Sequence, residues 1–241
     1  MKKKAWDEDN PDLLEQMKAE TERVYPNLHF QKKNGLVCVK GSFPVMYDNK
    51  ILDRFSIEIK IPRNYPEAVP IVFETEGRIP RVADRHMNEK GEACLFLPDE
   101  RWEAWPRGSS FLSFLQGPVH NFFLGQSLVE QGGEWPFGQW GHGLLGIFEY
   151  YSQIFETKDV DIIINYLDCL SNPKIKGHWD CPCGSGKRLR DCHLNVLMEL
   201  RQNIPLEVLR NSSNKMIVVE KSVMETMIQF NPLEKRLPKI E

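Results

Sequence analysis

The sequence predicts an α+β protein, because segments with helical periodicity stand on both sides of a segment with strand periodicity. A capping residue followed by proline, with apolar residues at helical spacing, predicts a helix over about 11–24. Apolar and polar residues alternate strictly from Arg54 to Ile61, which indicates a half-buried antiparallel strand. Helical spacing returns after about residue 109.

Shorter stretches complete the expected order of elements. Further strands are expected around 37–43 and 71–73, on either side of the alternating segment. The helices expected in the second half of the chain lie at about 109–115, 144–156, 159–170 and 194–201. Gly117-Pro118 is expected to interrupt the first of these or to begin another helix, because proline lacks a backbone donor and clashes with the preceding turn. The polar residues 171–177 predict a linker.

The composition is that of a globular protein. The 241 residues are 41% hydrophobic, enough for one large domain or for a medium domain with an appendage. The formal net charge of -3 gives no electrostatic reason to expect a nucleic-acid or membrane partner. The N-terminus turns from basic to acidic without an apolar run, and no stretch approaches the roughly 18 apolar residues of a membrane helix. A cytoplasmic location is therefore expected.

The six cysteines are distributed unevenly, and half of them stand close to a histidine. Cys38, Cys94 and Cys169 are isolated, whereas the grouped residues are Cys181, Cys183, Cys192 and His193. In a reducing cytoplasm this grouping indicates a metal site rather than disulfides. Three thiolates and one imidazole form a closed tetrahedral set, which is typical of structural zinc and leaves no position for a reacting water. A redox pair is the alternative, although it leaves Cys192 and His193 without a role.

One loop combines a cysteine with groups that suit acyl transfer. Asn88, Gly91 and Cys94 follow His86 within nine residues. The Cys94 thiol is the candidate nucleophile, and the Asn88 amide either stabilises the oxyanion that develops on the attacked carbonyl or pins the loop. His86 either shapes the loop through backbone hydrogen bonds or acts as a general base. The alternative for Cys94 is a small buried hydrophobic residue.

Polar and aromatic residues follow this loop directly and are candidates for substrate binding. Asp99 and Glu100 are placed to orient or deprotonate an incoming lysine, with a solvated acidic loop as the alternative. Trp102 either contacts the substrate or packs beneath the loop. The sequence contains no phosphate-cradling glycine loop that would adenylate a carboxylate.

The order of these features resembles the ubiquitin-conjugating enzyme fold, in which a helix and an antiparallel meander sheet precede the cysteine loop and C-terminal helices. The residues that carry the resemblance are Tyr65, Pro66, Pro70, His86, Asn88, Gly91, Cys94, Leu95 and Trp102, and it covers about 11–156. Met87 stands where the eukaryotic family has proline. The resemblance implies a thioester on Cys94 that is passed to a protein lysine or another amine.

Two narrower resemblances add a partner and a cofactor. The segment from Trp135 to Gly143, with Tyr150-Tyr151, is similar to the stand-alone conjugating-enzyme-like proteins of CBASS anti-phage operons. That family implies a donor, the C-terminus of a cGAS/DncV-like nucleotidyltransferase (CD-NTase), with a ubiquitin-like protein as the other candidate. Residues 181–193 resemble the SEC-C zinc motif, which implies zinc held by the four grouped ligands.

Three segments are therefore expected: a conjugating-enzyme-like catalytic domain over 1–157, a helix and linker over 158–177, and a zinc element with a tail over 178–241. The leading hypothesis is a cysteine-dependent transferase that serves antiviral defence. The alternative is a non-catalytic binding module that uses the zinc element as a docking surface. A third and weaker hypothesis is a cysteine hydrolase that pairs Cys94 with His86 or His142.

Overall fold

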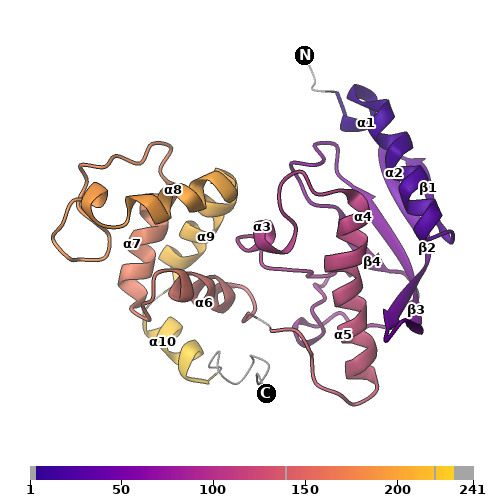
Figure 1. Ribbon diagram of the computed structural model, residues 1–241. Helices are drawn as coiled ribbons and strands as arrows, with labels where there is room; N and C mark the ends of the chain where they lie inside the picture. Colours follow the sequence, from indigo (N-terminus) through magenta and orange to yellow (C-terminus); the bar gives the residue numbers. More distant parts are fainter. Residues whose placement is uncertain (1–3, 139, 220, 231–241) are drawn as a thin grey trace. The chain divides into compact units, whose positions relative to one another are not determined.

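The computed structural model describes residues 4–138, 140–219 and 221–230, and Figure 1 shows the chain as a ribbon. Two compact units are present. The first contains the chain up to Leu95 together with Gly108–Pro136, and the second contains Phe96–Arg107 and the chain from Phe137 onward. Among the described residues, no helix has the length and apolar character that a membrane crossing requires.

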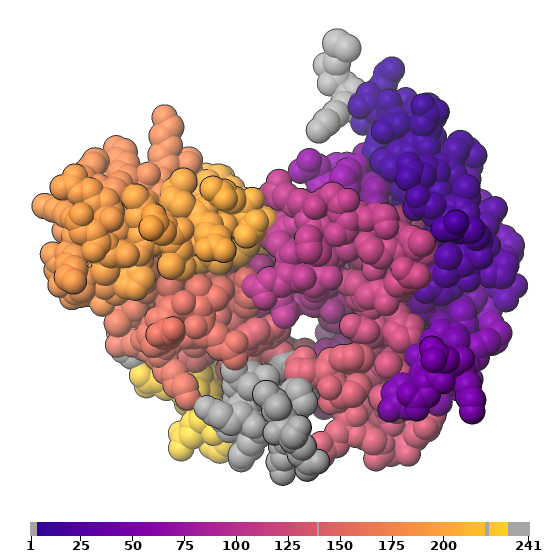
Figure 2. Space-filling view, viewed as in Figure 1, coloured from indigo at the N-terminus to yellow at the C-terminus, as the bar shows by residue number. Residues whose placement is uncertain are grey.

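The first unit is built on one antiparallel sheet. Its strands follow the order β1-β2-β3-β4, so each strand pairs with its neighbour in the sequence. The elements of this unit are α1 (Trp6–Asp9), α2 (Pro11–Val24), β1 (Leu28–Lys33), β2 (Leu36–Tyr47), β3 (Lys50–Ile61), β4 (Ile71–Glu74), η1 (Ala83–Arg85), α4 (Phe111–Phe114), η2 (Leu115–Val119) and α5 (His120–Glu130). The indigo segment of α1 and α2 lies at the surface of this unit in the space-filling view (Figure 2).

The predicted helix and the predicted alternating strand are both confirmed. Asn10 caps α2 by accepting the Leu13 N–H at 3.2 Å, and Pro11 occupies the first helical position. Four alternating apolar residues of β3 are buried, as the period of two requires; they are Phe55, Ile57, Ile59 and Ile61. In β2, a Cβ atom on Gly41 would lie 1.7 Å from the Asn27 carbonyl oxygen, so only glycine fits there.

The segment from Phe111 to Glu130 is helical throughout and covers the sheet. Pro118 lies inside a wide π-type turn, η2. Gly117-Pro118 was expected to interrupt the helix or to begin another, but the helical path continues through this turn. A π turn removes the usual conflict, because its longer hydrogen-bonding interval leaves room for a ring without an N–H. Phe123 of α5 packs against Phe43 and Phe55 of the sheet, with ring centroids 5.9 and 4.7 Å apart. This aromatic contact forms the centre of the first unit's core.

The described part of the second unit is helical. Its elements are α3 (Arg101–Ala104), α6 (Leu144–Ile154), α7 (Val160–Ser171), η3 (Leu189–Asp191), α8 (Leu194–Asn203), α9 (Leu206–Val218) and α10 (Lys221–Phe230). α7 and α9 pack against each other, and the buried residues of α6, α7, α8 and α9 form one apolar cluster. The expected helices near 144–156, 159–170 and 194–201 correspond to α6, α7 and α8.

The boundaries of the two units differ from the segments expected from the sequence. α6 lies within the predicted catalytic segment 1–157, yet it shares its core with α7 and α9 of the second unit. Residues 158–177, expected to form a helix and a linker, contain the whole of α7. The expected division into 1–157, 158–177 and 178–241 describes family segments rather than compact units, and it stays a prediction.

Candidate functional site

Cys94 lies in the loop that follows β4, and its side chain is exposed. Backbone hydrogen bonds hold the loop in place. The Cys94 N–H donates to the His86 carbonyl at 2.8 Å, and the Ala93 N–H donates to the Val72 carbonyl at 2.8 Å. Met87 and Ala93 form an isolated antiparallel bridge. The thiol is therefore presented by a folded loop at the edge of the sheet.

The Asn88 side chain is bonded within this loop. Its Nδ2 donates to Glu92 Oε2 at 2.6 Å, and its Oδ1 accepts the Glu92 N–H at 2.9 Å. A second contact runs through the backbone, where the Asn88 N–H donates to the Glu92 carbonyl at 3.1 Å. The amide thus pins the loop, which is one of the two roles considered for it. A role at the oxyanion requires the bond to Glu92 to open.

His86 shapes the same loop through its backbone. It has a φ of +47°, and its N–H donates to the Ala83 carbonyl at 2.7 Å at the end of η1. Its ring lies 4.3 Å from the ring of Trp135. The preceding residue is held from α5: Gln126 Oε1 accepts from Arg85 Nε, and Gln126 Nε2 donates to the Arg85 carbonyl, both at 2.8 Å.

The electrostatic surroundings of Cys94 favour the protonated thiol. Partial burial of the sulfur raises the pKa of Cys94, and the Glu92 carboxylate raises it further. Both effects disfavour the thiolate, so little of it is present at neutral pH. The Cys94 thiol is therefore harder to ionise than a free cysteine, mainly through burial and further through the Glu92 charge.

The expected substrate-binding residues belong to the second unit, whereas Cys94, Asn88 and His86 share one loop of the first. Asp99 is only 1% exposed. It accepts hydrogen bonds from the Tyr151 hydroxyl at 2.7 Å and from the Ser212 hydroxyl at 2.9 Å to each oxygen. Both oxygens are buried and accept hydrogen bonds, which differs from the solvated acidic loop, and contact between Asp99 and an incoming lysine stays a prediction.

The other two expected substrate-binding residues, Glu100 and Trp102, are also packed against neighbouring side chains. Burial raises the pKa of Glu100, against a hydrogen bond from Trp140 that lowers it. Trp102 lies between two guanidinium groups, with Arg101 at 3.9 Å and Arg107 at 4.5 Å from its ring centroid. For Trp102 this arrangement matches the packing alternative, and substrate contact by Glu100 or Trp102 stays a prediction.

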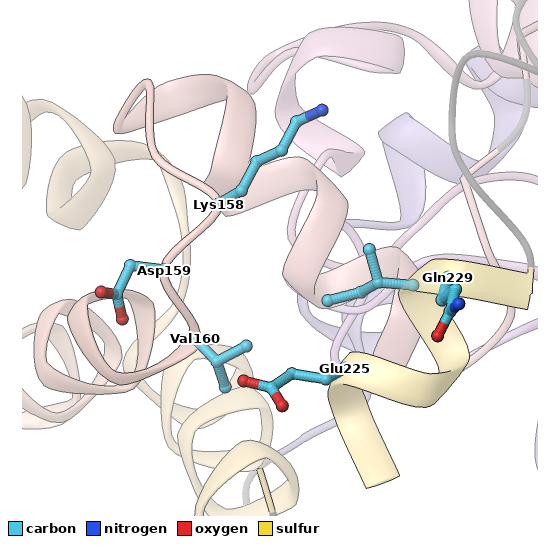
Figure 3. Close-up of a pocket in the computed structure, with 6 residues that line it drawn as sticks. Lys158, Asp159, Val160, Glu225 and Gln229 are labelled. Carbon is cyan, nitrogen blue, oxygen red and sulfur yellow. The ribbon is translucent and has the colours of Figure 1, made fainter. Parts of the chain in front are cut away.

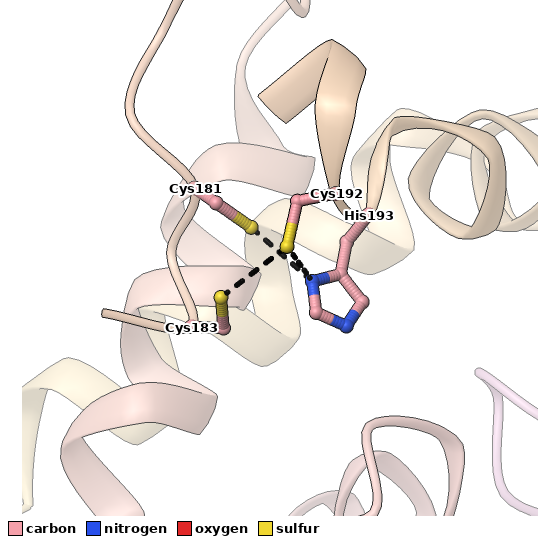
Figure 4. Close-up of side chains that lie close together, drawn as sticks. All are labelled: Cys181, Cys183, Cys192 and His193. Carbon is pink, nitrogen blue, oxygen red and sulfur yellow. Dashed lines mark hydrogen bonds between the residues drawn. The ribbon is translucent and has the colours of Figure 1, made fainter. Parts of the chain in front are cut away.

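The grouped cysteines and the histidine converge on one point (Figure 4). His193 Nδ1 lies 3.2 Å from Cys181 Sγ and 3.1 Å from Cys192 Sγ, and the sulfurs of Cys183 and Cys192 are 3.7 Å apart. All four ligand atoms lie within 4.8 Å of one another. They form a compact set of three sulfurs and one nitrogen, which we call the Cys3His cluster.

Local turns bring these ligands together. Asp180 and Arg188 form an isolated antiparallel bridge, and the Cys181 N–H donates to the Lys187 carbonyl at 2.9 Å. The chain between them reverses through Gly184 and Gly186, whose φ values of +75° and +72° favour glycine. His193 then stands at the N-terminal cap of α8. The ligands are thus fixed by a hairpin-like turn and a helix start.

The donor set fits a tetrahedral metal. Metal–ligand bonds of about 2.3 Å to sulfur and about 2.0 Å to nitrogen place two sulfurs about 3.8 Å apart and a sulfur and a nitrogen about 3.5 Å apart. The Cys183–Cys192 separation of 3.7 Å agrees with the first value, and the sulfur–nitrogen distances of 3.1 and 3.2 Å are close to the second. The cluster therefore has the composition and the spacing of a metal-binding site.

Hydrogen bonding within the cluster distributes the negative charge unevenly. Desolvation would raise the pKa of Cys183, but hydrogen bonds from Ser185 and from the neighbouring thiols lower it to about 6. Burial raises the pKa of Cys181 to about 11. A bound cation favours thiolates at all three cysteines, because coordination requires the deprotonated sulfur.

Several residues that build these sites were given no role in them by the sequence analysis. They are Glu92 and Gln126 around the Cys94 loop, Tyr151 and Ser212 around Asp99, and Tyr166 and Ser185 around the Cys3His cluster. Glu92 and Ser185 lie within the motifs, so inspection of the sequence could have singled them out. The other four depend on contacts between segments that are distant in the sequence.

A pocket of about 320 Å³ lies between the start of α7 and α10, and Figure 3 shows its lining. Lys158, Asp159 and Glu225 bring charges of both signs to it. The Asp159 carboxylate already caps α7 by accepting the N–H groups of Asp161 and Ile162. The pocket therefore contains no group set that selects one class of ligand.

Comparison with known proteins identifies the metal-binding segment. The SEC-C motif family matches residues 180–195, which include all four residues of the Cys3His cluster. A comparison of the whole chain with curated proteins finds no match.

Proposed function

We propose that the protein is a cysteine-dependent acyl transferase with ubiquitin-conjugating-like chemistry. The observation that carries this proposal is the exposed Cys94 thiol, presented by a backbone-fixed loop after a helix and a four-stranded antiparallel meander. This order of elements is the one that the resemblance to conjugating enzymes implies. The proposed donor is the C-terminus of a cGAS/DncV-like nucleotidyltransferase in a CBASS operon, with a ubiquitin-like protein as the other candidate.

In the proposed reaction, the Cys94 thiolate attacks the carbonyl carbon of an activated acyl donor, and the activating group leaves with the electron pair of its bond. The resulting thioester is then attacked by an amine, which forms an amide, loses a proton and releases the Cys94 thiolate. The donor has to arrive already activated, as an acyl adenylate or a thioester on another protein. The sequence contains no phosphate-cradling loop that would activate a carboxylate here.

The raised pKa of Cys94 suits a carrier of acyl groups. A thiolate of higher pKa is a poorer leaving group, so its thioester is lost more slowly to solvent. The same property slows the loading step, because less thiolate is present at neutral pH. The balance favours a carrier that holds its cargo until a good amine nucleophile arrives.

The test is a loading assay with each candidate donor, its activating enzyme and nucleotide. The expected product is an adduct on Cys94 that reductant cleaves. Cys94→Ser is the matched variant, because it should form an oxyester that resists reductant, and Cys94→Ala should form no adduct. Cys169→Ala is the control, since that thiol is buried. Unchanged conjugation by the Cys94→Ala variant would overturn the proposal.

A second candidate function is a non-catalytic binding module. The bonding of Asn88 favours it, because both ends of the amide are held by Glu92. In that case Cys94→Ala retains a stable complex with the partner, and no reductant-sensitive adduct forms with any donor. The same loading assay, combined with a pull-down, separates the two functions.

For the Cys3His cluster we propose zinc in a structural role, with Cys181, Cys183, Cys192 and His193 as its ligands. Zinc is preferred because it binds mixed thiolate and imidazole sets in tetrahedral geometry and has no redox chemistry. A cytoplasmic location belongs to this proposal, since the thiols have to remain reduced. Elemental analysis of the purified protein should give about one zinc per chain, and a Cys192→Ser variant should lose it.

A further inference from the structure

The Cys3His cluster contacts one buried aromatic residue outside the matched motif. Tyr166 of α7 is 1% exposed, and its ring meets the His193 ring edge-on, with centroids 5.5 Å apart at 83°. Tyr166 thus contacts one of the four proposed ligands directly, from a helix that lies upstream of the motif.

Tyr166 begins a column of buried rings that runs away from the cluster. Its ring stacks on Phe155, with centroids 3.7 Å apart and an interplanar angle of 5°. Phe155 in turn stacks on Tyr151, at 6.0 Å and 12°. Rings packed in this way are mechanically linked, because a displacement of one ring changes the space left for the next.

The far end of the column holds a buried carboxylate. The Tyr151 hydroxyl donates to Asp99, and the Ser212 hydroxyl of α9 donates to the same carboxylate. Asp99 is one of the residues that fix the segment Phe96–Arg107 inside the second unit. Along the chain, this segment starts two residues after Cys94.

We propose that metal binding at the Cys3His cluster and the anchoring of Phe96–Arg107 by Asp99 are thermodynamically coupled through the Tyr166–Phe155–Tyr151 column. The proposal rests on the metal role proposed above, and it is independent of acyl transfer. Metal occupancy fixes His193, His193 fixes Tyr166, and the column then fixes the hydroxyl that holds Asp99. Coupling is reciprocal, so weakening the Asp99 anchor weakens metal binding by the same factor.

The test uses Ser212→Ala, because Ser212 has no contact with the cluster or the column among those described and donates only to Asp99. Co²⁺ serves as the probe, since its thiolate complexes absorb visible light, and a competing chelator sets the affinity scale. We expect Ser212→Ala to bind Co²⁺ about fivefold more weakly, the lower end of typical coupling. Ser213→Ala is the matched control: the same substitution at the adjacent buried serine.

Two further measurements test whether the coupling reaches residues 96–107 and whether it runs through the column. Hydrogen exchange in peptides covering 96–107 should be slower with metal than without it. In a Phe155→Leu background, which breaks the column, Ser212→Ala should no longer change Co²⁺ affinity, because a double-mutant cycle isolates the shared interaction.

The outcomes separate this proposal from the one on which it rests. If the wild-type protein gives no cobalt–thiolate absorption, the metal role fails and the coupling fails with it. If cobalt binds but Ser212→Ala and Ser213→Ala have equal affinities, the coupling alone is overturned. Equal rates of hydrogen exchange in 96–107 with and without metal would likewise overturn the coupling alone.

Discussion

Asn88 and Glu92 are joined by two side-chain hydrogen bonds, so the carboxylate of Glu92 is held two residues before Cys94. The Asn88 amide donates to this carboxylate at 2.6 Å. A fixed negative charge near a thiol opposes its ionisation, and Glu92 raises the pKa of Cys94 in addition to the larger effect of burial. The loop that carries Cys94 therefore also lowers the fraction of its thiol that is ionised.

Glu92→Gln should make Cys94 more reactive. The substitution removes the charge, while the glutamine oxygen still accepts from Asn88, so the loop keeps its shape. The pKa of Cys94 should fall, although the burial effect remains. One pKa unit corresponds to a tenfold change in thiolate, so we expect alkylation of Cys94 at neutral pH to rise about two- to fivefold. The rate of iodoacetamide labelling across a pH series, followed on the Cys94 peptide, measures it.

Glu89→Gln is the matched control, because Glu89 is an exposed acid of the same loop. Its labelling profile should overlay that of the wild type. A Glu92→Gln profile that also overlays the wild type would mean that Glu92 does not influence the thiol.

Gln126→Leu should destabilise the segment that leads into the Cys94 loop. Gln126 is 0% exposed and makes two hydrogen bonds of 2.8 Å to Arg85, the residue before His86. Leucine fills a similar volume but leaves the Arg85 carbonyl and guanidinium without these partners. The expected loss in the free energy of unfolding is about 1–3 kcal/mol, measured by urea denaturation. Exchange at residues 83–88 should quicken.

Asn121→Leu tests a comparable substitution, of an amide side chain by leucine, on the exposed face of α5. It should change the free energy of unfolding by no more than about 0.5 kcal/mol. Equal urea midpoints for the two variants would show that Gln126 does not support the loop.

The sequence predicted best what depends on near neighbours. β3, α2 and the Cys3His cluster each follow from spacing within about a dozen residues, and the structure contains all three. The burial of Asp99 was not expected, because acids in a charged loop are usually solvated. Its burial depends on Ser212, 113 positions away, and no local pattern carries such information.

The helices α9 and α10 were not predicted for a related reason. α9 is amphipathic but weakly apolar, and it becomes a helix of the second unit by packing against α7. At Pro118 the general rule against proline in helices indicated an interruption, and a wide turn accommodated it. Sequence rules describe the preferred local state, whereas tertiary packing selected these exceptions.

Asp99→Asn should change how stability depends on pH. Burial raises the pKa of Asp99 in the folded protein, despite the hydrogen bonds from Tyr151 and Ser212 that lower it. The native state therefore holds its proton more tightly than the unfolded chain does. Wild-type stability should fall as pH rises from the unfolded-state value, about 3.9, through the higher folded-state pKa. The asparagine variant should lack this contribution.

The comparison is made on thermal or urea unfolding of the metal-loaded protein at each pH, so that proton release from the cluster is common to both chains. The difference between wild type and variant should grow toward acidic pH in favour of the wild type. A constant difference across the series would mean that Asp99 does not titrate in this window.

Removal of the metal should unfold the second unit beyond the motif itself. From the sequence alone, only the chain after about His178 is expected to unfold. In the structure, however, Leu189 and Leu197 beside the cluster share one core with α6 and α7. Structural zinc supplies apparent binding energies of about 10–16 kcal/mol, comparable to the whole stability of a domain. Chelation should therefore expose protease sites across 137–218, while the first unit keeps its sheet and resists cleavage, because its core is separate.

Cys192→Ser should reach the same cleavage pattern without chelator and show no further change when chelator is added. If the chelated wild type instead resists cleavage throughout 144–171, the core of α6 and α7 is stable without the metal, and the role of the cluster is confined to its own turn.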